Sequence, residues 1–233
     1  MLILFDIDAT LIKTSGLGIK AMGMAGRELF GESFNERTVE YAGRLDPLII
    51  ADLLRHHDIP DIGTNVTRFR AGYRRHLEHL LSEPGTGKAC PGVPALLQRL
   101  ATAASEGRTT IGLLTGNFPE TGRVKLHACG IDPDQFKVCA WGDESPHPTP
   151  ARDHLPPVAI ARHARHTGRD IDPRTVTIIG DTPHDIGCAR AHGCRSLGVA
   201  TGMFATGALR DAGADLALDD LSNTDEVASW LLQ

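Results

Sequence analysis

The sequence predicts an α/β fold, a doubly wound parallel sheet that carries an inserted all-helical segment. Two observations predict it. Short apolar runs alternate with amphipathic helical patterns along most of the 233 residues, which is typical of a parallel sheet covered by helices. Residues 15–83 contain no strand-like run and instead carry apolar residues at helical spacing, which indicates a separate helical unit.

The apolar runs give the expected strands, and the amphipathic stretches between them give the expected helices. Strands are expected at residues 2–6, 109–114, 137–140, 175–180 and 194–200, with a short final one at 214–218. Helices are expected at residues 93–105, 119–129, 156–167, 184–192 and 224–232.

The helical insertion is expected to form a cap over the carboxyl-terminal edge of the sheet. Its clearest pattern places Val66, Phe69, Tyr73 and Leu77 at steps of three and four. The turn-rich segments TSGLG and SEPGTGKACPG bound the insertion. We therefore expect an α/β core domain formed by residues 1–14 and 84–233, and a helical cap domain formed by residues 15–83.

The composition limits the partners and the location. A formal net charge of −5 argues against nucleic-acid binding, and no apolar run is long enough for a membrane span. The N-terminus shows no secretory signal, and the five cysteines are scattered without a C-x-x-C pair. These features favour reduced thiols and a cytoplasmic protein, either a monomer or a homodimer.

Polar residues follow three of the expected strands. They are Asp6 and Asp8, then Thr115, Gly116 and Asn117, then Asp181 and Asp185. Such residues meet at one edge of a parallel sheet, where ligands bind. Four gathered carboxylates repel one another unless a cation lies among them, and Mg²⁺ prefers such hard oxygen ligands. A helix that begins near Pro119 would add N–H groups that favour a phosphate. Ordinary turn chemistry is the alternative, but three such turns favour a metal–phosphate site.

The same segments resemble the motifs of one enzyme family. FDIDATLI resembles the D-x-D-G-T motif of the haloacid dehalogenase superfamily, LLTGN its second motif, and IIGDTPHDIGCARAHG its fourth. The segments IKTSGLGIKAMGMAGRELFG and AGRLDPLIIADLL resemble the helical cap of phosphoglycolate-phosphatase-like members. The resemblance spans about residues 2–202 and implies the fold of this superfamily, a Rossmann-like core with an inserted cap.

The resemblance also implies a reaction. Asp6 would attack phosphorus, and Asp8 would act as acid and then base. Mg²⁺ would be held by Asp6, the carbonyl of Asp8 and Asp181, with Asp185 in support, while Thr115, Gly116 and Asn117 would bind phosphoryl oxygens. A Mg²⁺-dependent phosphatase acting on a small phosphorylated metabolite is expected. A phosphomutase and a catalytically weak phosphate-binding protein are the alternatives.

Two departures from the family pattern concern the site. Ala9 replaces a glycine, at a cost of roughly 1 kcal/mol if the position needs positive φ. The lysine of the third motif is missing, and Arg152 stands in its place before the helix. Lys125 is a weaker candidate, because it lies on the order of 12 Å along its helix. His154 is the third.

One further residue concerns the substrate. Arg44, in the segment GRLD, would contact an anionic group when the cap closes. The same segment has a purely structural explanation, in which Asp46 caps the helix that it begins. Both readings are kept.

Overall fold

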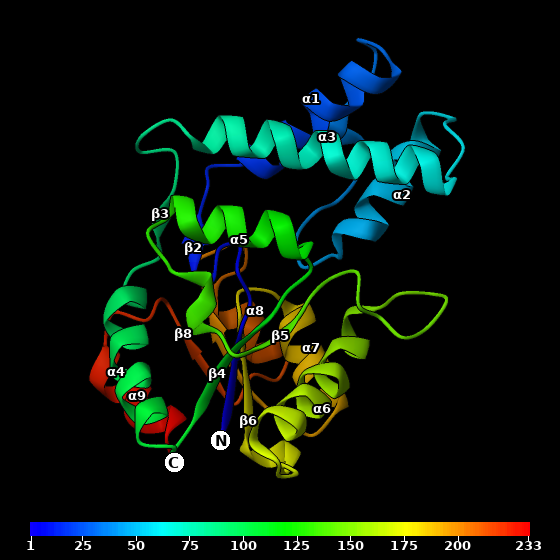
Figure 1. Cartoon of the computed structure of the whole chain (residues 1–233). Helices are drawn as coiled ribbons and strands as arrows, with labels where there is room; N and C mark the ends of the chain where they lie inside the picture. Colours follow the sequence, from blue (N-terminus) through cyan, green and yellow to red (C-terminus); the bar gives the residue numbers. More distant parts are fainter.

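The computed structural model describes all 233 residues and contains a six-stranded sheet in the order β5-β4-β1-β6-β7-β8 (Figure 1). Every neighbouring pair is parallel. The strands are β1 (Leu2–Phe5), β4 (Thr110–Leu114), β5 (Val138–Ala140), β6 (Val176–Gly180), β7 (Arg195–Val199) and β8 (Leu216–Leu218). All six lie within the segments expected to be strands, so the predicted doubly wound parallel sheet is confirmed.

Helices cover both faces of the sheet. They are α4 (Val93–Ser105), α5 (Pro119–Ala128), α6 (Leu155–Thr167), α7 (Pro183–Ala191), α8 (Thr206–Asp211) and α9 (Thr224–Leu231). Strand β1 divides the core by its alternation. Ile3 and Phe5 pack in the cluster that includes α4 and α9, whereas Leu2 and Leu4 pack in the cluster that includes α6 and α7. Helix α8 was not predicted.

Short 3₁₀ turns complete the core and the insertion, at Glu36–Thr38, Pro133–Gln135, Arg152–His154 and Pro173–Thr175. The turn at Arg152–His154 leads directly into α6 and brings Arg152 to the carboxyl-terminal side of the sheet. This location matters for the site described below.

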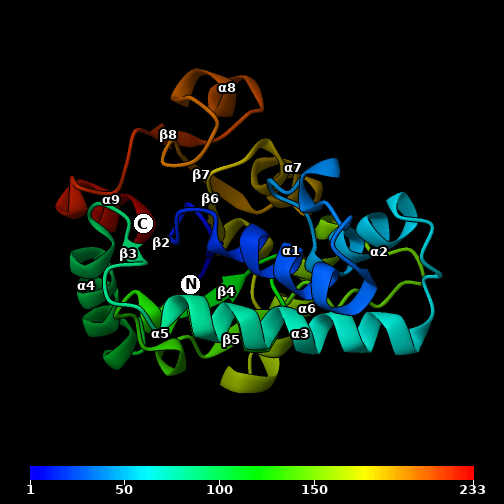
Figure 2. The same cartoon turned by 90° about the horizontal axis from the view of Figure 1, so that it is seen from above.

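The helical insertion lies across the carboxyl-terminal edge of the sheet (Figures 1 and 2). It consists of α1 (Leu17–Phe30), α2 (Asp46–His56) and α3 (Gly63–Leu81), which share a buried core of their own around Phe69 and Leu53. A two-stranded antiparallel ribbon, β2 (Ile12–Lys13) with β3 (Lys88–Ala89), joins the two segments of chain that lead into and out of these helices. This ribbon was not predicted, because two residues per strand give no periodicity to read.

The insertion is docked on α5 of the core by specific contacts. Arg70 of α3 forms an ion pair with Glu120 at 2.5 Å and another with Asp143 at 2.8 Å. Its guanidinium carbon also lies 3.9 Å from the ring centroid of Phe118, which packs with the core of the insertion. The space between the insertion and the sheet edge is therefore bounded by two units in contact.

Two further features of the structure concern the cysteines and the character of the helices. All five cysteines are free thiols. None of the helices combines the length and the apolar character that crossing a bilayer requires.

Candidate active site

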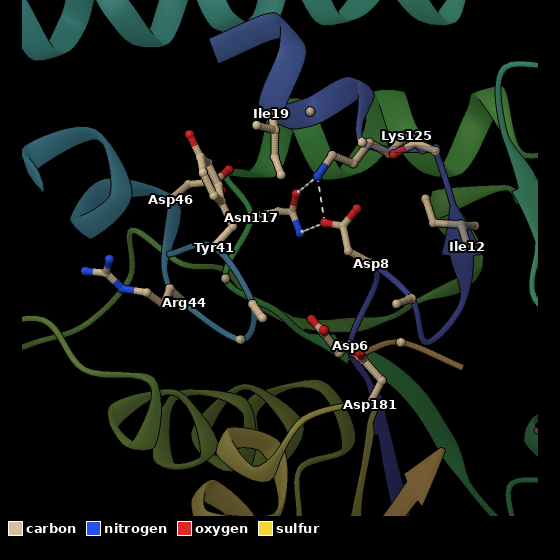
Figure 3. A pocket seen from close by; sticks show the side chains of 18 of the residues that line it. Asp6, Asp8, Ile12, Ile19, Tyr41, Arg44, Asp46, Asn117, Lys125 and Asp181 are labelled. Carbon is tan, nitrogen blue, oxygen red and sulfur yellow. Dashed lines mark hydrogen bonds and ion pairs between the residues drawn. The ribbon is translucent and has the colours of Figure 1, made fainter. Parts of the chain in front are cut away.

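A cavity of about 580 Å³ lies between the sheet edge and the helical insertion. The insertion contributes mainly apolar side chains to its wall, including Ile19 and Tyr41 (Figure 3). The core contributes charged and polar side chains, among them Asp6, Asp8, Asn117, Lys125, Arg152 and Asp181. Residues far apart in the sequence, such as Asp8 and Asn117 with a separation of 109 positions, thus meet where β1 is flanked by β4 and β6, the point at which the winding of the sheet reverses.

Three of the predicted carboxylates form a buried cluster on the floor of this cavity. Asp6 follows β1, while Asp181 and Asp185 follow β6, and one oxygen from each lies within 4.8 Å of the other two. The hydroxyl of Thr10 donates to Asp181 at 3.3 Å. Thr10, which follows the first motif's aspartates, thus contacts the acidic cluster.

The charges of this cluster are unbalanced. Burial raises the pKa of Asp6 to about 6, although Arg152 opposes the shift. Burial, together with the charges of Asp6 and Asp185, raises the pKa of Asp181 to about 8. Three carboxylates facing a single guanidinium leave an excess of negative charge, and all of the donor atoms are hard oxygens. The site therefore fits a divalent cation such as Mg²⁺.

Arg152 is the cation that contacts the cluster. Its Nη2 lies 3.1 Å from Asp6 Oδ1 and 2.5 Å from Asp185 Oδ1, and its Nη1 donates to the carbonyl of Gly43 in the insertion. Burial alone would lower the pKa of Arg152, but the two carboxylates outweigh burial and raise it. The structure thus places Arg152 beside the expected nucleophile, in the place that the sequence indicated.

Asp185 is occupied on both oxygens. Oδ1 binds Arg152, and Oδ2 accepts from the N–H and the hydroxyl of Thr182, at 3.1 and 2.7 Å, which caps α7. Asp185 is fully buried and does not line the cavity. It therefore supports the cluster from behind, whereas Asp6 and Asp181 face the cavity.

Asp8 belongs to a different group of contacts. Its Oδ2 lies 2.6 Å from Lys125 Nζ and 2.9 Å from Asn117 Nδ2, and Lys125 also donates to Asn117 Oδ1 at 2.5 Å (Figure 3). The carboxylate of Asp8 is thus turned toward the insertion and lies outside the acidic cluster. The expectation that its side chain joins the other carboxylates is contradicted; a contact through its backbone carbonyl stays a prediction.

The expectation that Lys125 lies too far along its helix was wrong. Side chains on a helix tilt toward its N-terminus, and a lysine reaches several ångströms beyond its Cα. Both effects bring the ammonium of Lys125 back to the sheet edge, where its side chain is only 5% exposed. His154, the third candidate, instead bonds Ser145 through Nδ1 at 2.8 Å.

The loop after β4 was expected to bind phosphoryl oxygens through Thr115, Gly116 and Asn117. The Thr115 hydroxyl accepts from Asn117 Nδ2 at 2.9 Å, and its dipole beside Asp6 opposes the rise in the pKa of that carboxyl. Both polar atoms of the Asn117 side chain are hydrogen-bonded, Nδ2 to Thr115 and Asp8 and Oδ1 to Lys125. The backbone N–H groups of Ile7, Asp8 and Gly116 have no acceptor within the chain, so these peptide donors are available to an oxyanion.

Arg44 lines the cavity, but its Nη2 pairs with Asp52 at 2.5 Å and its guanidinium points away from Asp6 and Asp8 (Figure 3). Its contact with an anionic group of the substrate stays a prediction. Asp46 does not cap its own helix. Its carboxylate accepts from the N–H of Phe118 at 3.1 Å and from the Thr121 hydroxyl at 3.4 Å, and so it caps α5 of the core. Burial raises the pKa of Asp46 to about 7, although Lys125 opposes the shift.

The loop that follows Asp6 and Asp8 turns sharply at Ala9. This residue has φ of 57°, in the left-handed region, which confirms that an alanine occupies a position suited to glycine. The Thr201 hydroxyl donates to the Ala9 carbonyl and fixes the turn. Before this turn, Asp6 lies in the buried cluster while the Asp8 carboxylate contacts Lys125.

The motifs and their geometry agree with a known family. A family model described as haloacid dehalogenase-like hydrolase matches residues 3–190, a span that contains every site residue predicted from the sequence. The chain belongs to this family. The resemblance seen in the sequence is therefore confirmed.

Similar proteins of this family cover the whole chain. Probable phosphatase IndB from Dickeya dadantii (strain 3937) is 26% identical over 234 residues, covering 100% of this chain and 95% of that protein. The structure of CbbY from Rhodobacter sphaeroides in complex with phosphate is 22% identical with a TM-score of 0.74, covering 95% and 94% of the two chains. A predicted phosphoglycolate phosphatase from Haemophilus somnus is 18% identical with a TM-score of 0.70, covering 97% and 96%.

Proposed function

We propose that this haloacid dehalogenase-like hydrolase is a Mg²⁺-dependent phosphatase that hydrolyses a small phosphorylated metabolite through an aspartyl phosphate on Asp6. The observation that carries the proposal is the contrast between the two carboxylates of the first motif. The Asp6 side chain is 7% exposed beside Arg152 and two further carboxylates, whereas the Asp8 side chain is 45% exposed at the cavity. Two carboxyl groups in different surroundings suit two different roles.

The proposed reaction has two steps. In the first, a carboxylate oxygen of Asp6 forms a bond to phosphorus while the bond from phosphorus to the ester oxygen breaks, and Asp8 gives a proton to that oxygen. In the second, Asp8 takes a proton from a water molecule whose oxygen attacks the phosphorus. The bond between phosphorus and Asp6 then breaks, and phosphate is released with Asp6 regenerated.

The surrounding groups supply electrostatic stabilisation. Arg152 would bridge the nucleophile and the phosphoryl oxygens, because its guanidinium already contacts Asp6. The unpaired N–H groups of Ile7, Asp8 and Gly116 would bind the remaining oxygens. Mg²⁺, when bound by Asp6 and Asp181, would neutralise the negative charge of the phosphoryl group.

The substrate is proposed to be small. The cavity volume of about 580 Å³ suits a single metabolite, and the helical insertion closes the cavity from above. A predicted phosphoglycolate phosphatase is among the similar proteins, so phosphoglycolate belongs in the test panel, together with sugar phosphates and nucleotides. The free cysteines favour a reducing compartment, so we propose a cytoplasmic enzyme.

The test is phosphate release from a panel of phosphorylated metabolites and p-nitrophenyl phosphate, with Mg²⁺ and with chelator. We expect release that requires the metal and that falls by about 10⁴-fold or more in Asp6→Asn. Asp211→Asn, at an exposed position on α8, is the matched control and should keep full activity. Transfer of phosphate to a sugar without steady release of phosphate would favour the phosphomutase instead. If no compound is turned over, the protein would be a phosphate-binding protein without catalytic activity.

A further inference from the structure

We propose that Lys125 is a positioning residue for Asp8, and that it makes Oδ1 of Asp8 the oxygen that exchanges protons. This inference rests on the proposed function. It starts from a difference between the two oxygens of one carboxylate. Oδ2 is held by Lys125 at 2.6 Å and by Asn117 at 2.9 Å, whereas Oδ1 has no partner within the chain. The oxygen without a partner is the one available to the leaving group and to water.

The holder is itself rigid. Lys125 is buried, and a buried ammonium is favourable only when its donors are paired. Two donors are used, toward Asp8 and Asn117, and Asn117 is in turn anchored on Thr115 at 2.9 Å. Because Thr115 follows β4 and Asp6 follows β1, the strand that pairs with it, these contacts tie the acid–base residue to the strand end beside the nucleophile.

The helical insertion closes over Lys125. A Cβ atom placed on Gly18 of α1 would lie 3.4 Å from Lys125 Nζ and 3.5 Å from the Tyr73 hydroxyl, so α1 passes directly over the ammonium. This cover shields the Lys125 ammonium from water, whereas the Asp8 carboxylate stays open to the cavity. The geometry thus gives the two buried cations separate tasks: Arg152 serves the nucleophile, and Lys125 serves the acid–base residue.

Loss of Lys125 should affect the two steps of the proposed reaction differently. p-Nitrophenolate is a stable anion and departs without a proton, so the first step with p-nitrophenyl phosphate needs little help from Asp8. The second step needs Asp8 to take a proton from water for every substrate. General acid–base catalysis contributes about 10²–10⁴-fold, and a mispositioned base loses part of that. Loss of Lys125 should therefore slow hydrolysis of the intermediate more than its formation.

The test is rapid-mixing and steady-state kinetics of Lys125→Met in the full chain with Mg²⁺. With p-nitrophenyl phosphate we expect a burst of about one equivalent of p-nitrophenolate, followed by turnover slowed about 10- to 100-fold, with KM lowered in parallel and kcat/KM nearly kept. With an alkyl ester such as glycerol 2-phosphate, whose leaving group needs the proton, kcat/KM should also fall about 10-fold or more. Lys125→Arg should restore part of the rate, and Lys20→Met, at an exposed position on α1, is the control.

Two outcomes would overturn the proposal. If kcat falls without a burst and with KM unchanged, Lys125 only maintains the fraction of folded enzyme. If both substrates are turned over at the wild-type rate, Lys125 does not position Asp8. Failure of the proposed function itself looks different, because then the wild-type protein would release no phosphate or Asp6→Asn would remain active.

Discussion

Two groups of charged residues lie on opposite sides of one cavity, and they differ in how their charge is balanced. In the first group, Asp6, Asp181 and Asp185 face only Arg152. In the second, Asp8 faces Lys125, one carboxylate for one ammonium. The first group has more negative charge than the protein itself neutralises, whereas the second is neutral as it stands.

The difference shows how one short loop can carry two functions. A site with excess carboxylates attracts a cation and holds it, as a metal centre must. A neutral, hydrogen-bonded pair attracts nothing further, and its effect is to fix geometry. Asp6 and Asp8 are only two residues apart, yet Asp6 belongs to the first group and Asp8 to the second.

The largest expected effect on stability comes from Arg152→Met measured in chelator. This change removes the only cation from the first group and leaves its carboxylates buried and unpaired, so we expect the free energy of unfolding to fall by about 3–5 kcal/mol. Urea titration checks it. Arg162→Met is the control, since its pair with Glu144 is partly exposed and should contribute about 1 kcal/mol or less. If both variants lose the same free energy of unfolding, Arg152 does not compensate the buried carboxylates of the first group as proposed.

Metal binding gives a second test. If the first group holds Mg²⁺, a concentration 100 times the dissociation constant should stabilise the protein by about 3 kcal/mol, which raises Tm by several degrees. Asp181→Asn should abolish most of this shift, because it removes one oxygen that faces the cavity. Lys125→Met should keep the shift, because it belongs to the second group. If Mg²⁺ raises Tm equally in Asp181→Asn and in the wild type, the metal does not bind at this cluster.

A third prediction concerns Asp46, which adjoins the second group. Its pKa is raised by burial to about 7, so between about pH 4 and pH 7 the folded protein keeps a proton that the unfolded chain has lost. The free energy of unfolding must then fall as pH rises through that window, by about 2 kcal/mol between pH 5.5 and pH 7. Asp46→Asn cannot ionise and lacks this contribution.

The measurement is urea unfolding of the wild type and Asp46→Asn at several pH values from 5.5 to 8. The stability of Asp46→Asn relative to the wild type should increase over this range. Asp6 and Asp181 titrate in both proteins, so their contributions cancel in the difference. Parallel curves would mean that Asp46 is already ionised in the folded protein at the lower pH.

Much of the fold and the first group could be predicted from the sequence, for a simple reason. The carboxyl ends of parallel strands share one edge, so residues that follow such strands must converge there whatever the details of packing. Asp6, Asp181 and Asp185 are of this kind. Arg152 was placed correctly beside them because its position before α6 brings it to the same edge.

The second group could not be predicted, because its contacts depend on side-chain direction and on how the insertion docks. Lys125 was judged by the position of its Cα, but its side chain reaches back to Asp8. Asp46 caps a helix of the core from a helix of the insertion, a contact that no local pattern encodes. The ion pair between Arg44 and Asp52 of α2 was likewise not predicted.

The smallest expected effect concerns the turn that follows Asp8. Ala9 has φ of 57°, where an alanine is strained and a glycine is not, so Ala9→Gly should stabilise the protein by up to about 1 kcal/mol and raise Tm by a few degrees. Ala161→Gly, at an exposed position inside α6, is the matched control and should destabilise by a similar amount, because there the glycine brings only flexibility. If the strain has no part in the reaction, Ala9→Gly should also keep kcat. Higher stability with a lower kcat would instead mean that the strain at Ala9 helps to hold the neighbouring Asp8 in the orientation that the reaction needs.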